Sequence, residues 1–247
     1  MAVVSARRPA ISTVIAFAVM SDVAASGDPL SLDLQSLFRR PEMFDSPDDW
    51  RAAGFKIVRA SPSLKKVIVA KHKAARGYLF KKYNNRVPLK DQLQKFRRRL
   101  EGASKLRAFI GEMKFKHVVV PRKWLYELPP KFTREMPAYL VIVEKLPVFD
   151  RESDESARRH RHVDLDVLRE LCAVFYKCRG LDFTDKNAPF TKQGQVAFID
   201  TEYLDWQDTR KSAQKRKKRF MKCAERHLSG KRLEFAEARW EELSGGG

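Results

Sequence analysis

The stretch that most constrains this chain is residues 180–202, which read GLDFTDKNAPFTKQGQVAFIDTE. Three of its polar side chains carry oxygen atoms at defined intervals: Asp182, then Asn187 five residues later, and then Asp200 thirteen residues after Asn187. The Pro, Gly and polar residues between the last two predict a hairpin over residues 189–195. This spacing is typical of a metal site in which two segments bring their ligands together.

Oxygen ligands of this kind suit Mg²⁺, the ion that neutralises the β- and γ-phosphate charge of a nucleoside triphosphate. Asn187 and Asp200 would supply those oxygens, and Asp182 would accept the proton of an attacking hydroxyl. The apolar run of residues 196–199 (VAFI) predicts a buried strand that delivers Asp200 at its end. An ordinary hairpin with Asp and Asn as turn and cap residues would have the same sequence pattern.

In this loop the chain resembles the protein-kinase-like superfamily, especially its compact bacterial and aminoglycoside-phosphotransferase-like members, which share a D-x-x-x-x-N loop and a later metal-binding Asp. The resemblance implies an ATP- and Mg²⁺-dependent phosphotransferase in which Asp182 is catalytic and Asn187 and Asp200 bind the metal. Two dipeptides depart from the family pattern. Gly180-Leu181 replaces the His-Arg that precedes the catalytic Asp, and Thr201-Glu202 replaces the Phe-Gly that follows the second Asp.

The first half of the chain contains short apolar runs separated by turn signals, which predict antiparallel strands at residues 55–58, 66–70 and 78–83. The resemblance implies that a lysine on the third strand holds the α- and β-phosphates. Because side chains alternate along a strand, only one of Lys81 and Lys82 can face a nucleotide, and Lys81 shares a face with the apolar Leu79. We therefore expect Lys81 to hold the phosphates, with Lys82 as the second nucleotide-binding candidate. Both could instead be solubilising residues of an edge strand.

Residues 88–115 have apolar side chains at three- and four-residue steps, which predict an amphipathic helix with Pro88 in its first turn. In the kinase interpretation this helix carries a glutamate that orients Lys81. Glu101 is the first candidate, and Glu112, eleven residues later on nearly the same face, is the second. Each could instead be a surface carboxylate.

Two further strands are predicted, at residues 118–128 and 138–146. The second ends in polar residues, as a strand leading into a hinge between two lobes would, and the backbone of Glu144 and Leu146 is the predicted adenine-binding segment. A helix over residues 164–179, closed by Gly180, then leads into the catalytic loop. The predicted fold class is α+β, a two-lobed kinase-like fold. It has a small antiparallel-sheet lobe that contains one helix, and a reduced, mainly helical lobe.

The predicted organisation has four parts in chain order. Residues 1–27 have a basic start, an apolar stretch and a small-residue end, which fit either a secretory signal or a disordered N-terminus. The apolar stretch is too short to span a membrane, so no transmembrane helix is expected in the mature chain. Residues 28–50 are an N-terminal extension, residues 51–146 the small β-rich lobe, and residues 147–243 the helical lobe with the catalytic loop and basic C-terminal helices. A cytoplasmic and a secreted location both stay open.

The chain has 50 Lys and Arg residues against 31 Asp and Glu residues, a net charge of +19, which favours anionic partners. The densest basic run lies between Arg210 and Arg219 (RKSAQKRKKR), where seven of ten residues are basic. It predicts contact with an anionic surface. The predicted acceptors are an acidic protein or a phosphorylated small molecule. Shorter basic runs at residues 97–99 and 158–162 are typical of solvated helix faces.

Two other functions compete with the kinase interpretation. The turn after the first strand, residues 60–64 (ASPSL), has no glycine with which the backbone could approach phosphate closely, and this favours a catalytically inactive kinase-fold binding module. The basic charge also allows a nucleic-acid-binding protein, although no zinc-finger or helix-turn-helix spacing supports it. The three cysteines, Cys172, Cys178 and Cys223, show no metal or disulfide spacing and are expected to be free.

Overall fold

The computed structural model describes residues 33–39, 44, 46–60, 67–83, 88–128, 138–150, 153–178, 181, 187–201 and 210–245. For residues 210–216 and 219 it describes the backbone alone. The predicted N-terminal segment, residues 1–27, and the predicted catalytic residue Asp182 lie outside the described residues. The chain divides into two compact units, here called the first unit (Met1–Gln92 with Trp124–Ile142) and the second unit (Leu93–Lys123 with Val143–Gly247).

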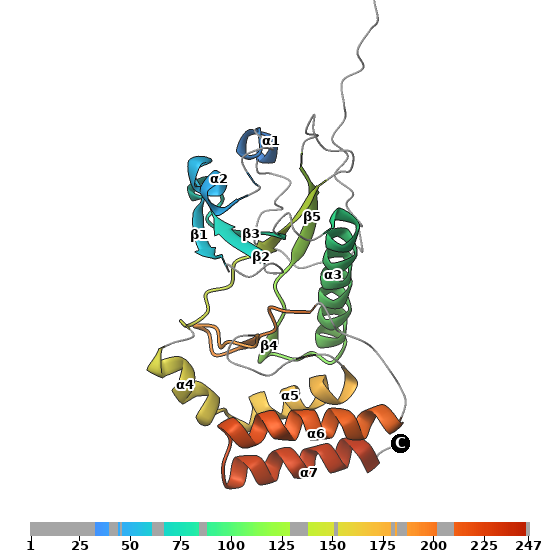
Figure 1. Cartoon of the computed structure of the whole chain (residues 1–247). Coiled ribbons are helices and arrows are strands. Elements are labelled where there is room, and N and C mark those ends of the chain that lie inside the picture. Colours follow the sequence, from blue (N-terminus) through green and yellow to red (C-terminus); the bar gives the residue numbers. More distant parts are fainter. Residues whose placement is uncertain are drawn as a thin grey trace, which may run out of the picture. The chain divides into compact units, whose positions relative to one another are not determined.

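The first unit is built on a five-stranded antiparallel sheet with the strand order β1-β2-β3-β6-β5 (Figure 1). Its strands are β1 (Lys56–Arg59), β2 (Val67–Lys71), β3 (Tyr78–Tyr83), β5 (Lys123–Glu127) and β6 (Tyr139–Glu144). The three strands predicted at residues 55–83 are therefore confirmed within a residue or two. In the register of β2 and β3, Lys81 lies opposite Val69 and Lys82 lies opposite Ile68.

Two short helices of the predicted N-terminal extension precede the sheet. Asp33 caps α1 (Leu34–Leu37), and Ser46 with Asp49 forms a capping box at α2 (Pro47–Ala52). Helix α1 ends at Leu37, with Phe38 as its C-cap. The extension contributes aromatic rings to the hydrophobic core of the sheet, because Phe38 packs with residues from β1, β3 and the end of β5 in one buried cluster.

The strand predicted at residues 118–128 is two strands, and this prediction is therefore wrong. Its first part is β4 (Val118–Val119), which pairs in parallel with β7 (Val196–Ala197) in the second unit. Its second part is β5, which belongs to the sheet of the first unit. The buried Pro121 lies between them, and a proline has no N–H to donate to a strand partner, so the pairing is interrupted there.

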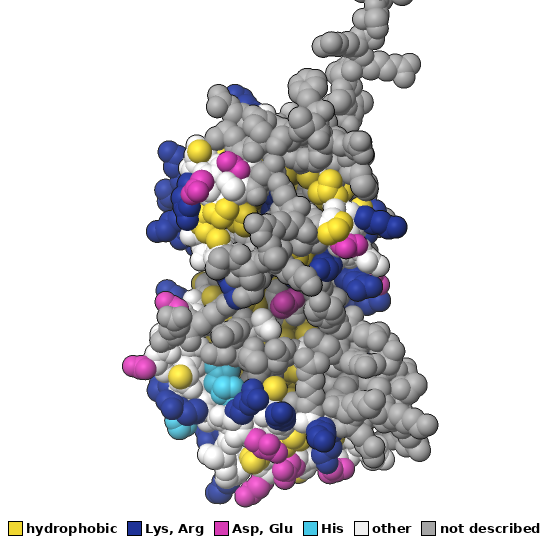
Figure 2. Space-filling view, in the orientation of Figure 1, with side chains coloured by type: hydrophobic (Ala, Val, Ile, Leu, Met, Phe, Trp, Pro, Cys, Tyr) yellow, Lys and Arg dark blue, Asp and Glu magenta, His cyan; other side chains and the backbone are white. Residues whose placement is uncertain are grey.

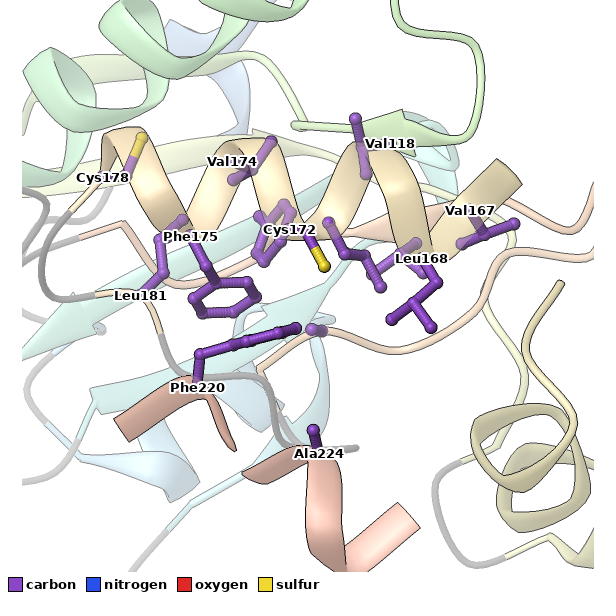
Figure 3. Close-up of a cluster of buried hydrophobic side chains, with 14 of the residues drawn as sticks. Val118, Val167, Leu168, Cys172, Val174, Phe175, Cys178, Leu181, Phe220 and Ala224 are labelled. Atoms are coloured by element: carbon purple, nitrogen blue, oxygen red, sulfur yellow. The ribbon is translucent and has the colours of Figure 1, made fainter. Parts of the chain in front are cut away.

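The second unit is organised around α5 (Leu165–Lys177), a largely buried helix. It packs against α6 (Arg210–His227) and α7 (Lys231–Gly245), and Figure 3 shows the ring of Phe175 facing Phe220 of α6. The centroids of these two rings lie 5.1 Å apart. The remaining helices are α3 (Leu89–Glu112), which begins in the first unit, and α4 (Asp154–Arg161). Gly230, with a φ of +52°, separates α6 from α7, as the sequence predicts.

The predicted end of α5 is wrong. The helix ends at Lys177 with Cys178 as its C-cap in extended conformation, so Gly180 does not close it. Leu165, the first residue of α5, is 46% exposed, and the buried residues of the helix start at Val167. The three cysteines are free, as expected, and burial raises the pKa of Cys172 to about 12.

Two surface properties of the helices, their charge and their apolar character, can be described. On the face drawn in Figure 2, Lys and Arg side chains lie next to Asp and Glu side chains over the helices of the second unit. Within the described part of the chain, none of the helices has the length and the apolar character needed to cross a membrane.

Candidate functional site

The predicted hairpin between Asn187 and Asp200 is present. Phe190 and Val196 form an antiparallel bridge, and the Thr191 N–H donates to the Gln195 carbonyl over 2.7 Å. Gly194 in the turn has a φ of +85°, a left-handed conformation that glycine adopts without strain from a Cβ atom. The Gln193-Gly194 pair is therefore the turn that the sequence predicts.

The apolar run before Asp200 forms a buried strand, as predicted, although β7 itself is short. The Val196 N–H donates to the His117 carbonyl over 2.8 Å, and the Phe198 N–H donates to the Val119 carbonyl over 2.9 Å. Val196, Ala197 and Phe198 are buried, whereas Asp200 is exposed. The strand pairing thus carries the chain from the core of the second unit to an exposed carboxylate.

A backbone hydrogen bond pairs Asn187 with Ile199, the residue before Asp200. The Ile199 N–H donates to the Asn187 carbonyl over 3.0 Å, and the Ala197 N–H donates to the Pro189 carbonyl over 2.9 Å. Asn187 is half-buried and lies directly across from the residue before Asp200. The two oxygen-bearing side chains, which are thirteen residues apart in sequence, therefore belong to one short piece of paired backbone.

The segment that carries Asn187 is held from α4 by a buried histidine. His160 is 1% exposed, and its Nδ1 lies 2.8 Å from the Ser156 carbonyl oxygen while its Nε2 lies 3.2 Å from the Ala188 carbonyl oxygen. Its ring also packs edge-on against Phe190, with the centroids 5.0 Å apart. His160 lies in the basic run of residues 158–162 that is predicted to be solvated, and that prediction is wrong for this residue. A signal for its burial is the four-residue spacing from Ser156, which puts both residues on one face of the helix, but the neighbouring arginines obscure it.

The segment that carries Asp200 is held by the next residue. Thr201 is 1% exposed, its Oγ1 donates to the Arg99 carbonyl of α3 over 2.8 Å, and it accepts a hydrogen bond from Lys123 Nζ over 2.7 Å. In the sequence, Thr201 stands out only as a departure from the Phe-Gly pattern. No local sequence signal points to these contacts, because Arg99, Lys123 and Thr201 are far apart in the chain.

The two lysine candidates lie on opposite faces of β3 in the first unit. Lys82 is 1% exposed, and its Nζ lies 3.5 Å from the Tyr83 carbonyl oxygen. Lys81 is half-buried and shares the other face with Leu79, in agreement with the alternation on which its choice rests. Lys81 and the pair Asn187 and Asp200 belong to different units, so a site that combines them stays a prediction.

The glutamates predicted to orient Lys81 are both exposed on α3. Glu101 forms an ion pair with Lys105, one turn further along the helix, with 2.7 Å between Lys105 Nζ and Glu101 Oε1. Such an exposed pair contributes little to stability and leaves the carboxylate able to exchange partners. A pairing of Glu101 or Glu112 with Lys81 stays a prediction, because Lys81 belongs to the other unit.

The predicted adenine-binding segment is partly engaged within the second unit. The Glu144 N–H donates to the Arg122 carbonyl over 2.9 Å, and the Glu144 carboxylate accepts from the Arg122 N–H over 3.0 Å. The Glu144 N–H is therefore not a donor for a base. Leu146 accepts from the Val148 N–H over 2.9 Å, and its own N–H has no partner among the described residues. Leu146 is thus the better of the two backbone candidates.

A second arginine adds positive charge beside Glu144. Burial and the nearby Arg122 guanidinium lower the pKa of Arg107, while the Glu144 carboxylate acts in the opposite direction. The Glu144 carboxylate itself forms an ion pair with Arg122, whose Nε lies 3.4 Å from Glu144 Oε2.

The donor set of Asn187 and Asp200 suits a hard divalent cation. A carboxamide oxygen and an exposed carboxylate are ligands that Mg²⁺ accepts, and the exposure of Asp200 leaves room for the water molecules that Mg²⁺ retains. No group of three or more His, Cys, Asp and Glu side chains suited to a metal occurs among the described residues.

Comparison with known proteins places the chain in no family. No protein-family model matches its sequence, and no curated protein is significantly similar to it.

Proposed function

We propose that this protein is an ATP- and Mg²⁺-dependent phosphotransferase of two-lobed kinase-like fold that acts on a hydroxyl of a protein or a small molecule. The observation that carries the proposal is the hydrogen bond from the Ile199 N–H to the Asn187 carbonyl, 3.0 Å long. It supports the proposal because it pairs Asn187, the last residue of the D-x-x-x-x-N loop, with the residue before Asp200, the later Asp that would bind a metal. An ordinary hairpin needs no such pair of oxygen ligands at its open end.

Each residue of the proposed site has one task. Asn187 and Asp200 would hold Mg²⁺, which supplies positive charge to the phosphates of ATP. Asp182 would orient the acceptor hydroxyl and accept its proton. Lys81 would hold the α- and β-phosphates, with Glu101 orienting it. These groups act by position and charge, which is how most phosphoryl transfer is catalysed.

The proposed acceptors are an acidic protein or a phosphorylated small molecule, because the chain carries a net charge of +19. The basic run from Arg210 to Arg219 lies on α6 and is the proposed contact for an anionic surface. Within it, Lys217 forms an ion pair with Glu241 of α7, whereas Lys218 is exposed.

The test is the thermal stability of the full chain with and without ATP and Mg²⁺. A ligand at one hundred times its dissociation constant stabilises a protein by roughly 2.7 kcal/mol. We expect this shift in the parent and its loss in Asp200→Ala and Asn187→Ala. Asp164→Ala is the matched control, because Asp164 is an exposed aspartate of the same unit whose side chain makes no cap hydrogen bond. An equal shift in parent and Asp200→Ala would contradict the proposal.

A second measurement separates a kinase from a binding module of the same fold. Asp182→Asn should keep the ATP-dependent shift and abolish phosphate transfer, because it changes the proton acceptor and spares the metal ligands. A parent that binds ATP without turnover favours the inactive module, for which the glycine-free turn at residues 60–64 is the specific observation. Polyanion binding that falls steeply with salt and ignores Asp200→Ala would favour a nucleic-acid-binding protein.

A further inference from the structure

Thr201 is one of few buried polar side chains in the described part of the molecule, and its hydroxyl both donates and accepts a hydrogen bond. It donates to the Arg99 carbonyl over 2.8 Å and accepts from Lys123 Nζ over 2.7 Å. Both distances are ideal for an O–H or N–H donor. A Thr hydroxyl has one donor site and two acceptor sites. Because the buried Thr201 hydroxyl both donates and accepts a hydrogen bond, the rotamer and the position of this side chain are defined.

The two residues that hydrogen-bond to Thr201, Arg99 and Lys123, both belong to the second unit. Arg99 lies within α3, and a helix carbonyl has a second lone pair that can accept a side-chain donor. Lys123 follows Arg122, whose backbone N–H and carbonyl are both bonded to Glu144. Thr201 therefore joins the end of the hairpin to two elements that are remote from it in sequence.

We infer that Thr201 is a positioning residue for Asp200, and that its hydroxyl fixes the backbone from which the metal-binding carboxylate projects. The inference rests on the proposed function of Asp200. Thr201 is the next residue along the chain, so its two hydrogen bonds prevent the peptide of Asp200 from rotating. The paired backbone of Ile199 and Asn187 is then fixed at both ends, by the hairpin turn at one end and by the hydrogen bonds of Thr201 at the other.

The competing explanation is that Thr201 only adds stability. Thr191 separates the two explanations, because it is also 1% exposed and lies in the same hairpin. Its Oγ1 accepts the Gln195 N–H over 3.1 Å in the turn, away from both ligands. Thr→Val at either position removes a buried hydroxyl at nearly constant volume, so the two variants differ mainly in which hydrogen bonds are lost.

The experiment compares the parent, Thr201→Val, Thr201→Ser and Thr191→Val as full chains by two readouts. The first readout is amide hydrogen exchange, which needs no ligand. We expect at least tenfold faster exchange of the Ile199 amide in Thr201→Val and of the Gln195 amide in Thr191→Val, with no crossed effect. The second readout is Mn²⁺ binding in the presence of ATP, measured by electron paramagnetic resonance. We expect about tenfold to hundredfold weaker binding in Thr201→Val alone, the usual effect of losing an outer-shell contact, and near-parent binding in Thr201→Ser.

Each outcome decides the matter. Unchanged exchange of the Ile199 amide in Thr201→Val overturns the positioning role whether or not the chain binds a nucleotide. If the Ile199 amide exchanges faster in Thr201→Val but the parent binds no Mn²⁺ in the presence of ATP, the metal role of Asp200 is overturned, and the inference with it. Equal loss of Mn²⁺ affinity in Thr201→Val and Thr191→Val shows a structural effect only. If Thr201→Val does not fold, Lys123→Met, which removes one of the two bonds at a half-buried position, is judged by the same criteria.

Discussion

The centre of the first unit and the candidate site of the second unit are held together by different forces. Phe38 packs against five rings of the first unit at centroid distances of 4.9 to 6.4 Å. The segments beside Asn187 and Asp200 are held instead by buried polar side chains, His160 and Thr201, at distances of 2.7 to 3.2 Å. One region is an aromatic core, and the other is a set of directional bonds to the backbone.

The difference between the two regions concerns how accurately each type of contact fixes the positions of the atoms that it joins. Aromatic packing stabilises a fold strongly, but ring pairs accept a range of angles and separations. Hydrogen bonds weaken steeply when their geometry changes, so they fix the atoms that they join. A metal site needs ligands at fixed places. The polar contacts of His160 and Thr201 therefore lie where the proposed chemistry needs them, whereas the rings around Phe38 stabilise the core of the first unit.

The largest effect should come from the aromatic core. Phe38→Ala should lower the free energy of unfolding of the first unit by about 3–5 kcal/mol, because it removes a fully buried ring and leaves a cavity. Denaturant unfolding followed by amide exchange would measure it. Leu37→Ala, one residue earlier and only half-buried, is the control. A loss in Phe38→Ala no greater than in this control would show that the extension contributes little to the core.

A smaller effect is expected at the histidine of the second unit. His160→Leu should lower the free energy of unfolding by about 2–3 kcal/mol. The leucine fills the space of the ring, but the buried Ala188 carbonyl loses the imidazole nitrogen that lies beside it. The exposed neighbour His162 provides the control, and His162→Leu should change stability by less than about 0.5 kcal/mol. Thermal unfolding with amide exchange of the residues around Asn187 would measure both variants. Similar stability in the two variants would mean that the His160 contacts do not hold the loop.

Local patterns in the sequence were enough to predict much of the fold. The strands of residues 55–83, the long helix that became α3, and the hairpin before Asp200 all follow from apolar spacing and turn residues within a few positions of each other.

Contacts between distant residues could not be predicted in the same way. The parallel pairing of β4 with β7 joins residues 118–119 to 196–197, and only the tertiary fold brings them together. The burial of His160 and Thr201 depends on elements that meet in space, so their polar character suggested exposed positions. The proposed site was therefore predictable as a set of ligands, whereas the contacts that hold those ligands were not.

The turn after α3 offers a test in the stabilising direction. Lys114 has a φ of +53°, a left-handed conformation that is strained for a residue with a Cβ atom. The Phe115 N–H donates to the Ile110 carbonyl over 3.0 Å, as in a Schellman motif, where glycine is preferred. Lys114→Gly should raise the free energy of unfolding by about 0.5–1 kcal/mol. Denaturant unfolding would show this, and the neighbouring Met113→Gly, at a position without positive φ, should destabilise instead.

The smallest effect concerns an exposed ion cluster on α4 of the second unit. The Glu155 carboxylate accepts hydrogen bonds from Arg158 and Arg159, and these bonds lower its pKa from 4.5 to about 2. Because the pKa in the folded state is below that in the unfolded state, the stabilisation is complete above about pH 4.5 and is lost as the pH falls towards 2. Glu155→Gln should therefore flatten the pH dependence of stability in this window. Unfolding at pH 2 to 6 would test this, with the exposed Glu225→Gln as control, and a carboxyl NMR titration of Glu155 with a midpoint near 4.5 would contradict it.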